Sequence, residues 1–272
     1  MQIAKNILNF YIDSSLHVAL SVYALIRITF LKFELPYDEA VAYFGFYGTI
    51  VGYNFIKYDE LARVKKVKLT TSFKAIIVLS LLSFFAAFYY FLQLQTITKV
   101  LGIIGLLITI LYTLPFFPNK PNLRNWAGIK IYLVALAWVV VTVWLPVLNA
   151  VYGLDIVVVL KSIQRFIFVF VLMLVFEIID LQHDANYLQT IPQKIGIPAT
   201  KLLTYFLLVV FFLMDFLKPN VSNRELYIIS LVALVVGGFS YFANQNRSKY
   251  FTSFWVEGIP FFWLLLLLIV FK

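Results

Sequence analysis

Apolar runs long enough to cross a membrane recur along the whole chain, and this repetition constrains the fold more than any single motif. A membrane-spanning helix needs about 20 mainly apolar residues. Such runs lie near residues 10–32, 38–57, 75–94, 99–117, 129–149, 157–179, 199–217, 226–243 and 253–271. Charged residues make up 13% of the chain, too few to cover the surface of a water-soluble globule. We therefore predict an all-α polytopic membrane protein with about nine transmembrane helices around a central cavity.

Short connections join the predicted helices, and proline and glycine mark their turns. We find no repeat, low-complexity tract or shift in composition that would indicate a domain boundary, so we expect one membrane-embedded domain over residues 1–272. Arg27 interrupts the first apolar run, and no small-residue cleavage site follows it. We therefore expect the first helix to remain as an anchor.

The distribution of basic residues predicts the orientation of the chain. Most lysines and arginines fall in the N-terminal segment and in the even-numbered connections. The positive-inside rule then places the N-terminus in the cytoplasm, and we expect an integral protein of the bacterial inner (plasma) membrane. The net charge of +9 is explained by this topology and by attraction to anionic lipid headgroups, so we expect no nucleic-acid partner.

The most informative short segment follows the sixth predicted span. Glu177, Asp180 and Asp184 occur at positions i, i+3 and i+7, a spacing that puts three carboxylates on one helical face. Such a face at a membrane boundary is costly unless a cation lies on it, and Mg²⁺ held together with a phosphorylated substrate is a suitable cation. The alternative is a solvated helix end whose acids meet only water and nearby lysines.

Polar residues also gather in the other connections predicted on the cytoplasmic side. Asn54 and Tyr58 are four residues apart and share a helical face at the end of the second span. Tyr112 precedes the fourth-to-fifth connection. Cations in these segments could neutralise a diphosphate, although each one alone is also explained by the positive-inside rule. These cations are Lys57, Arg63, Lys120, Arg124, Lys130 and Lys194.

The order of acids and turn residues after the sixth span resembles a motif of the UbiA superfamily of intramembrane prenyltransferases. The second motif of that family runs roughly D-x-x-D-x-x-x-D, followed by Thr-Leu-Pro and Leu-Gly. The corresponding residues here are Glu177, Asp180, Asp184, Thr190-Ile191-Pro192 and Ile195-Gly196, and Tyr112 with Pro115 matches a Tyr-x-x-Pro common in the family. Members have nine helices and two aspartate-rich motifs that face each other at the cytoplasmic side, in agreement with the predicted helix count and orientation.

The resemblance implies an integral membrane prenyltransferase that transfers an isoprenyl group from an allylic diphosphate to an aromatic or lipid acceptor with Mg²⁺. The implied metal ligands are Glu177, Asp180, Asp184 and Asp59. The implied catalytic residues are Asp180, Asp184, Asn54 and Tyr58, and Tyr112 and the six cations would bind the substrate. The expected partners are an isoprenyl diphosphate donor, a hydrophobic acceptor and membrane lipid.

The first motif of the family departs from its pattern in this chain. The family has N-D-x-x-D-x-x-x-D after the second helix, and aligning its Asn on Asn54 puts Phe55, Tyr58 and Ala62 at the three acidic positions. Asp59 and Glu60 could substitute only if the helix unwinds there, because one step along a helix turns a side chain by about 100°. The alternative function is therefore a catalytically impaired relative that binds an isoprenoid or serves in assembly. A transporter is a third class, but paired half-sequences are not visible.

Four of the polar side chains inside predicted spans have not yet been explained. His17 is expected to form hydrogen bonds between packed helices. Arg27 and Arg165 are expected to reach toward the membrane surface, with an internal pair with an acid as the alternative. Glu257 precedes Gly258, and either hydrogen-bonded packing or the lining of a cavity would explain it.

Overall fold

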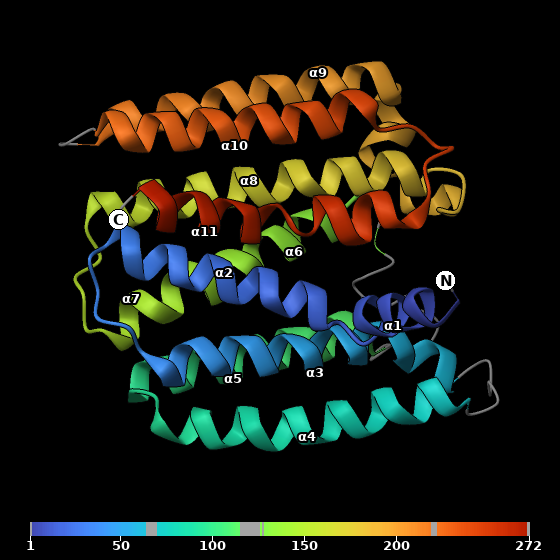
Figure 1. Ribbon diagram of the computed structural model, residues 1–272, viewed down its shortest axis with the longest axis horizontal. Coiled ribbons are helices and arrows are strands. Elements are labelled where there is room, and N and C mark those ends of the chain that lie inside the picture. The colour runs from blue at the N-terminus through green and yellow to red at the C-terminus, as the bar shows by residue number, and fades with distance from the viewer. Residues whose placement is uncertain (1, 64–69, 115–125, 127, 219–221, 271–272) are drawn as a thin grey trace.

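The computed structural model describes residues 2–63, 70–114, 126, 128–218 and 222–270. Within these ranges the secondary structure is helical, and no strand occurs. The α-helices are α1 (Gln2–Asp13), α2 (Leu16–Lys32), α3 (Glu39–Arg63), α4 (Thr71–Gln93), α5 (Thr96–Thr113), α6 (Lys130–Val139), α7 (Leu145–Asn149), α8 (Ile156–Asp180), α9 (Ile191–Leu213), α10 (Asn223–Phe242) and α11 (Ile259–Val270). Figure 1 shows the long helices lying side by side along the long axis of the molecule.

Shorter helical segments extend or interrupt several of these helices. The π-helical segment η2 (Val140–Trp144) joins α6 to α7, and the π-helical segment η5 (Phe251–Val256) precedes α11. The 3-10 segments are η3 (Asn186–Leu188), before α9, and η4 (Met214–Leu217), after it. Such irregular turns within long helices commonly occur where side chains of neighbouring helices must be accommodated.

Seven helical stretches of the described chain are long and apolar enough to cross a membrane. They are 71–93, 96–113, 130–149, 156–180, 191–217, 223–242 and 251–269. The pair α1 and α2, bent by 56° at its break, would make an eighth. The long helix α3 is not among them, because tyrosines and glycines dilute its apolar residues. The structure thus confirms an all-α membrane protein, and it does not confirm nine spans.

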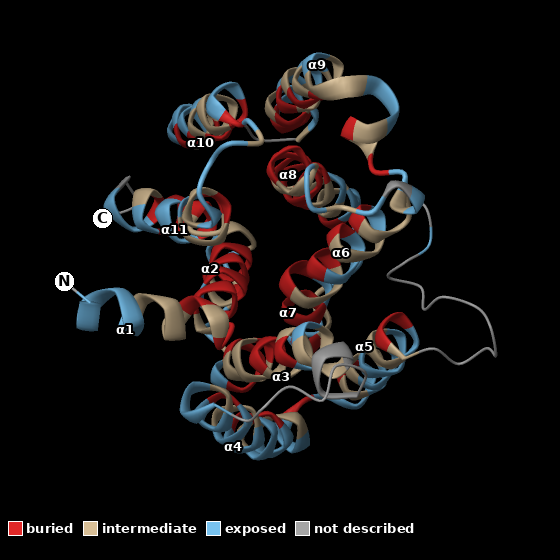
Figure 2. Ribbon diagram, turned by 90° about the vertical axis from the view of Figure 1, so that its right-hand side faces the viewer, coloured by how far each residue is buried: buried red, intermediate tan, exposed pale blue. Residues whose placement is uncertain are grey.

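The burial pattern shows which helices form the interior. α8 and α2 carry more buried apolar side chains than any other helix, including Phe168, Leu174 and Leu25, and both lie well inside the bundle in Figure 2. α4 and α5, by contrast, expose large apolar side chains such as Phe85 and Leu107. An apolar face of that extent is unfavourable in water and suits contact with lipid.

The connections place most of the predicted functional segments at one end of the bundle. α8 ends and α9 begins at this end of the bundle, and α3 also ends there (Figure 1). The opposite end holds the α7–α8 connection around Leu154. With a rise of 1.5 Å per residue, the 25 residues of α8 separate the two ends by about 37 Å.

This separation allows a test of the predicted orientation. The chain contains no cysteine, so single cysteines can be introduced at Tyr187, beyond the end of α8, and at Leu154, before its start. Both side chains are exposed, at 61% and 66%. In intact cells a membrane-impermeant thiol reagent should label Leu154→Cys and spare Tyr187→Cys. Labelling of Tyr187→Cys alone would show that the orientation is opposite to the predicted one.

Candidate functional site

The three acids of the α8 motif lie close together, but not on one helical face as predicted. α8 ends at Asp180, so Asp184 belongs to the turn that follows it. The backbone N–H groups of His183 and Asp184 donate to the Asp180 carbonyl at 2.7 and 2.9 Å, and this turn folds Asp184 back toward the helix. The acids therefore come together through a tight turn rather than through helical periodicity.

Glu177 connects this motif to the next helix. Its side chain is buried, at 4% exposure, and its Oε2 accepts a hydrogen bond from the Ile191 backbone N–H at 3.1 Å. A carboxylate at the first turn of a helix satisfies a free N–H group and interacts favourably with the helix dipole. Glu177 thus fixes the start of α9 against the end of α8, which gives it a structural role beside the predicted metal role.

Two of the predicted cations lie at this cluster. Lys130, at the start of α6, is within electrostatic range of both Glu177 and Asp180. The Gly128 backbone N–H donates to the Leu188 carbonyl at 2.8 Å, which holds the start of α6 on the loop after α8. The Lys194 ammonium lies beside Gly128, where a Cβ atom would meet it at 3.8 Å. Lys130 thus acts on the acids directly, and Lys194 lies beside the segment that holds the start of α6 on the loop.

Asp184 Oδ2 in this loop is buried and lacks a hydrogen-bond partner in the described chain. Buried oxygen atoms are rarely left unpaired, because the desolvation of each one is unfavourable. Asp184 Oδ2 is therefore an oxygen of this turn that could accept a further hydrogen bond or bind a cation.

The cluster fits a magnesium ion only together with phosphate oxygens. Among the described residues, no three acidic, histidine or cysteine side chains converge closely enough to hold a metal by themselves. Mg²⁺ in proteins is commonly bound through one or two carboxylates and the phosphates of a substrate, with water completing the octahedron. Asp180 and Asp184 could supply such a partial donor set.

The residues aligned with the first motif are bound to another part of the fold. Asn54 is buried at 4% exposure, its Nδ2 donates to the Ser14 carbonyl at 3.0 Å and to Ser80 Oγ at 2.9 Å, and its Oδ1 accepts from Ser15 Oγ at 2.8 Å. Ser15 has a positive φ of 63° and forms the break between α1 and α2. Asn54 therefore stabilises a strained turn between two helices.

Lys57 and Tyr58 act at the same break. Lys57 Nζ donates to the carbonyls of Ile12 and Asp13 at 3.3 and 3.4 Å, and Tyr58 Oη donates to the Asp13 carbonyl at 2.7 Å. These carbonyls are at the end of α1, where the helix leaves them without intrahelical partners. The polar face predicted on α3 therefore exists, and the structure shows it capping α1. Its catalytic and substrate roles stay predictions.

The local unwinding that Asp59 and Glu60 would need in order to replace the aligned acids does not occur. α3 stays helical through Arg63, so Asp59 and Glu60 follow the regular rotation of the helix and do not replace the aligned acids by unwinding. The side chains of Glu60 and Arg63, and all of Lys120 and Arg124, lie outside the described residues. Asp59 itself has an interaction partner.

Aromatic side chains lie between the two motif regions. Tyr112 is buried near the end of α5 and lies within electrostatic range of Tyr53 on α3. The Tyr53 hydroxyl accepts a hydrogen bond from Trp138 Nε1 at 2.7 Å. The structure therefore connects α3, α5 and α6 through polar aromatic contacts close to the residues that the sequence singled out.

One site residue was missed by the sequence analysis. Gln193 Oε1 accepts from the Thr190 backbone N–H at 2.9 Å, and its Nε2 donates to the carbonyls of Asp184 and Ala185 at 3.4 and 3.3 Å. Gln193 thus fixes the acidic turn on the first turn of α9. The signal was present as Thr-x-x-Gln, the spacing of a capping box.

Comparison with known proteins gives no family assignment. No family model, curated protein or solved structure matches the chain. The function must therefore be argued from the acidic turn, the nearby lysines and the membrane setting.

The hydrogen bonds of Asn54 predict a stability effect that is separate from any catalytic role. Asn54→Ala should lower the free energy of unfolding by about 1–3 kcal/mol, because it leaves buried polar groups unpaired. The change should appear as a lower midpoint of thermal unfolding in detergent. Asn6→Ala, at an exposed position of α1, is the matched control and should have little effect. Unchanged stability of the Asn54 variant would contradict the structural role.

Proposed function

We propose that the protein is a UbiA-like intramembrane prenyltransferase that transfers an isoprenyl group from an allylic diphosphate to an aromatic or lipid acceptor, with Mg²⁺. The main observation in favour is the acidic turn after α8, where Asp184 Oδ2 is buried and unpaired among the described residues. Lys130 lies within electrostatic range of Asp180, and Lys194 lies beside Gly128, which is hydrogen-bonded to Leu188 of the same loop. Acids for a metal next to cations for phosphate oxygens are the combination that a diphosphate requires.

Each group has a defined role in this proposal. Asp180 and Asp184 would bind Mg²⁺ together with the diphosphate, and Lys130 and Lys194 would offset the remaining negative charge. Bound Mg²⁺ would supply positive charge where the leaving group becomes more negative. The bond between the allylic carbon and the diphosphate oxygen breaks, and the electron pair leaves with the diphosphate. The acceptor then forms a bond to the allylic carbon and releases a proton.

The membrane interior provides the surroundings that the isoprenyl chain needs. An allylic carbocation is stabilised by aromatic faces, and Tyr53, Tyr112 and Trp138 lie near one another on α3, α5 and α6. The isoprenyl tail is apolar and is favoured in contact with lipid or with the apolar bundle interior. Both features support a reaction that begins at the polar end and extends into the membrane.

The metal role can be tested by binding. Asp180→Asn and Asp184→Asn should each weaken Mg²⁺-dependent binding of geranyl diphosphate by about 10-fold to 100-fold or more, because each removes a negative metal ligand with little change in shape. Titration calorimetry with MgCl₂, and with EDTA in its place, measures the effect. Asp155→Asn at the other end of α8 is the control, because Asn also caps helices and Asp155 is the N-cap there. Equal binding by all four proteins would leave the acids as a solvated helix end.

A second candidate function is an isoprenoid-binding or assembly protein without turnover. It is favoured by the hydrogen bonds that commit Asn54, Lys57 and Tyr58 to the α1–α2 break, because these residues align with the first metal motif. Only one acidic motif would then act on the diphosphate.

Release of diphosphate distinguishes the two functions. Purified protein with radiolabelled allylic diphosphates, Mg²⁺ and membrane lipid extract as the source of acceptor should release diphosphate if it is a transferase. The released diphosphate should fall to background in Asp184→Asn and persist in Asp155→Asn. Mg²⁺-dependent binding without release would establish the binding protein instead.

A further inference from the structure

Arg165 is a buried cation without a described anionic partner. It lies on α8 within the bundle at 6% exposure, which excludes the expected extension to the membrane surface. Its Nη1 donates to the Leu25 carbonyl at 3.2 Å and to Thr142 Oγ1 at 3.0 Å, and its guanidinium lies 5.6 Å from the Trp263 ring centroid. Neutral groups of this kind orient a guanidinium but do not balance its charge, and an unbalanced charge in an apolar interior is strongly unfavourable.

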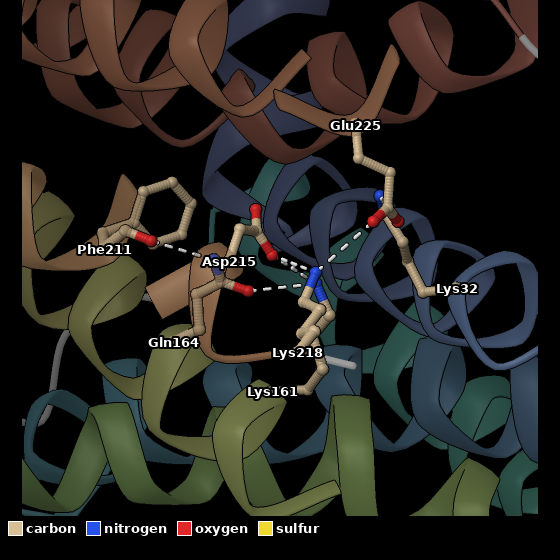
Figure 3. Close-up of polar contacts among 7 residues, drawn as sticks. All are labelled: Lys32, Lys161, Gln164, Phe211, Asp215, Lys218 and Glu225. Carbon is tan, nitrogen blue, oxygen red and sulfur yellow. Dashed lines mark hydrogen bonds and ion pairs between the residues drawn. The ribbon is translucent and has the colours of Figure 1, made fainter. Parts of the chain in front are cut away.

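The nearby carboxylates are engaged by lysines. Asp215 pairs with Lys218 and, at 3.3 Å, with Lys161, and Glu225 pairs with Lys32 and, at 3.5 Å, with Lys218 (Figure 3). In this part of the described chain three lysines share two carboxylates, and neither carboxylate forms an ion pair with Arg165. Lysines, and not Arg165, are therefore the described ion-pair partners of both carboxylates.

A small cavity lies beside this arginine. Its lining residues are Ile28, Thr29, Lys32, Phe33, Val143, Lys161, Gln164, Arg165 and Trp263. Trp263 is 3% exposed, and its indole N–H is buried with no acceptor among the described residues. The cavity has about 10 Å³ of free volume, which is room for one water molecule or a similar ion.

Lys32, Lys161, Arg165 and Trp263 all line the cavity and carry hydrogen-bond donor groups. Gln164 Oε1 already accepts from Lys161 Nζ at 3.1 Å. Thr29 Oγ1 already donates to the carbonyls of Leu25 and Thr142. The charged residues that line the cavity are all cationic, namely Lys32, Lys161 and Arg165, and Trp263 adds an N–H without a described acceptor.

We propose that this cavity is a binding site for a single monatomic anion, chloride in a cell, held between Arg165, Lys161 and Trp263. An anion balances the arginine charge and accepts from the indole N–H, and a water molecule would do only the second. A phosphate or a lipid headgroup is much larger than the free volume. The anion would connect α8 to α11 and, through the lining residues Ile28 and Thr29, to α2.

This site is separate from the acidic turn. Arg165 and Asp180 are 15 residues apart on the continuous helix α8, a distance of about 22 Å along its axis. The inference therefore does not depend on the proposed transferase function, and its failure would leave that function untouched.

Thermal unfolding in matched salts tests the proposal. The purified protein in detergent should unfold about 2–4 °C higher in sodium chloride or bromide than in sodium gluconate of the same ionic strength, because a ligand bound only to the folded state stabilises it. The shift should saturate with halide concentration. Gluconate is too large for the cavity, so it controls for ionic strength and for surface screening.

Three variants assign the effect to this cavity. Arg165→Gln should abolish the halide-dependent shift, and Trp263→Phe, which keeps the packed ring and removes the N–H, should reduce it severalfold. Arg27→Gln is the matched control: Arg27 is another span arginine, but its guanidinium lies over the Tyr37 ring and does not line the cavity. It should keep the full shift.

The contrary results are equally defined. An equal melting temperature in chloride and gluconate for the wild-type protein would mean that the cavity holds water, and the proposal would fail. A halide shift that Trp263→Phe and Arg165→Gln both retain would place the ion elsewhere. If Arg165→Gln does not fold, the halide-dependent shifts of Trp263→Phe and Arg27→Gln still test the site. The proposal fails if these two shifts are equal.

Discussion

The bilayer offers no hydrogen bonds to the chain, so every polar group between the helices has to find its partner inside the protein. This requirement explains why so many of the interhelical contacts are short polar bonds. His17 shows it clearly: its two ring nitrogens meet the Tyr11 hydroxyl at 2.9 Å and the Phe254 carbonyl at 2.8 Å, and so join α2 to α1 and to η5. Ser21 adds a hydrogen bond to the Glu257 carbonyl in the same region. Polar residues in the spans therefore determine which helices are neighbours, while apolar burial alone would not discriminate between them.

The class of fold could be predicted from the sequence because the signal is repeated and strong. Apolar runs near 20 residues exclude a soluble globule, and the described helices follow those runs closely. The number of membrane-spanning helices was harder to predict. α3 contains glycines and tyrosines that weaken its apolar character, although it packs between α2 and α4. Position within a bundle, rather than composition, determines how such a helix is surrounded, and one sequence does not contain that information.

The candidate site was predictable only where spacing along the chain implies proximity. Glu177 and Asp180 were placed correctly at one helix end, while the position of Asp184 depended on a turn that helical periodicity cannot represent. The partners of Asn54 are 26 to 40 residues away in sequence, so no local pattern could have indicated them. Arg165 is a similar case: sequence reasoning offered exposure at the surface or a pairing acid, and the described contacts provide neither.

The bend after α1 has a consequence for how the bilayer acts on the protein. α1 leaves α2 at 56° and exposes Ile3 and Ile7, the arrangement of a helix that rests in the headgroup layer. Its last carbonyls are held by Lys57 and Tyr58 of α3. A shift of α1 relative to α2 would therefore break or move contacts of α3, so the position of α1 and the polar end of α3 are coupled.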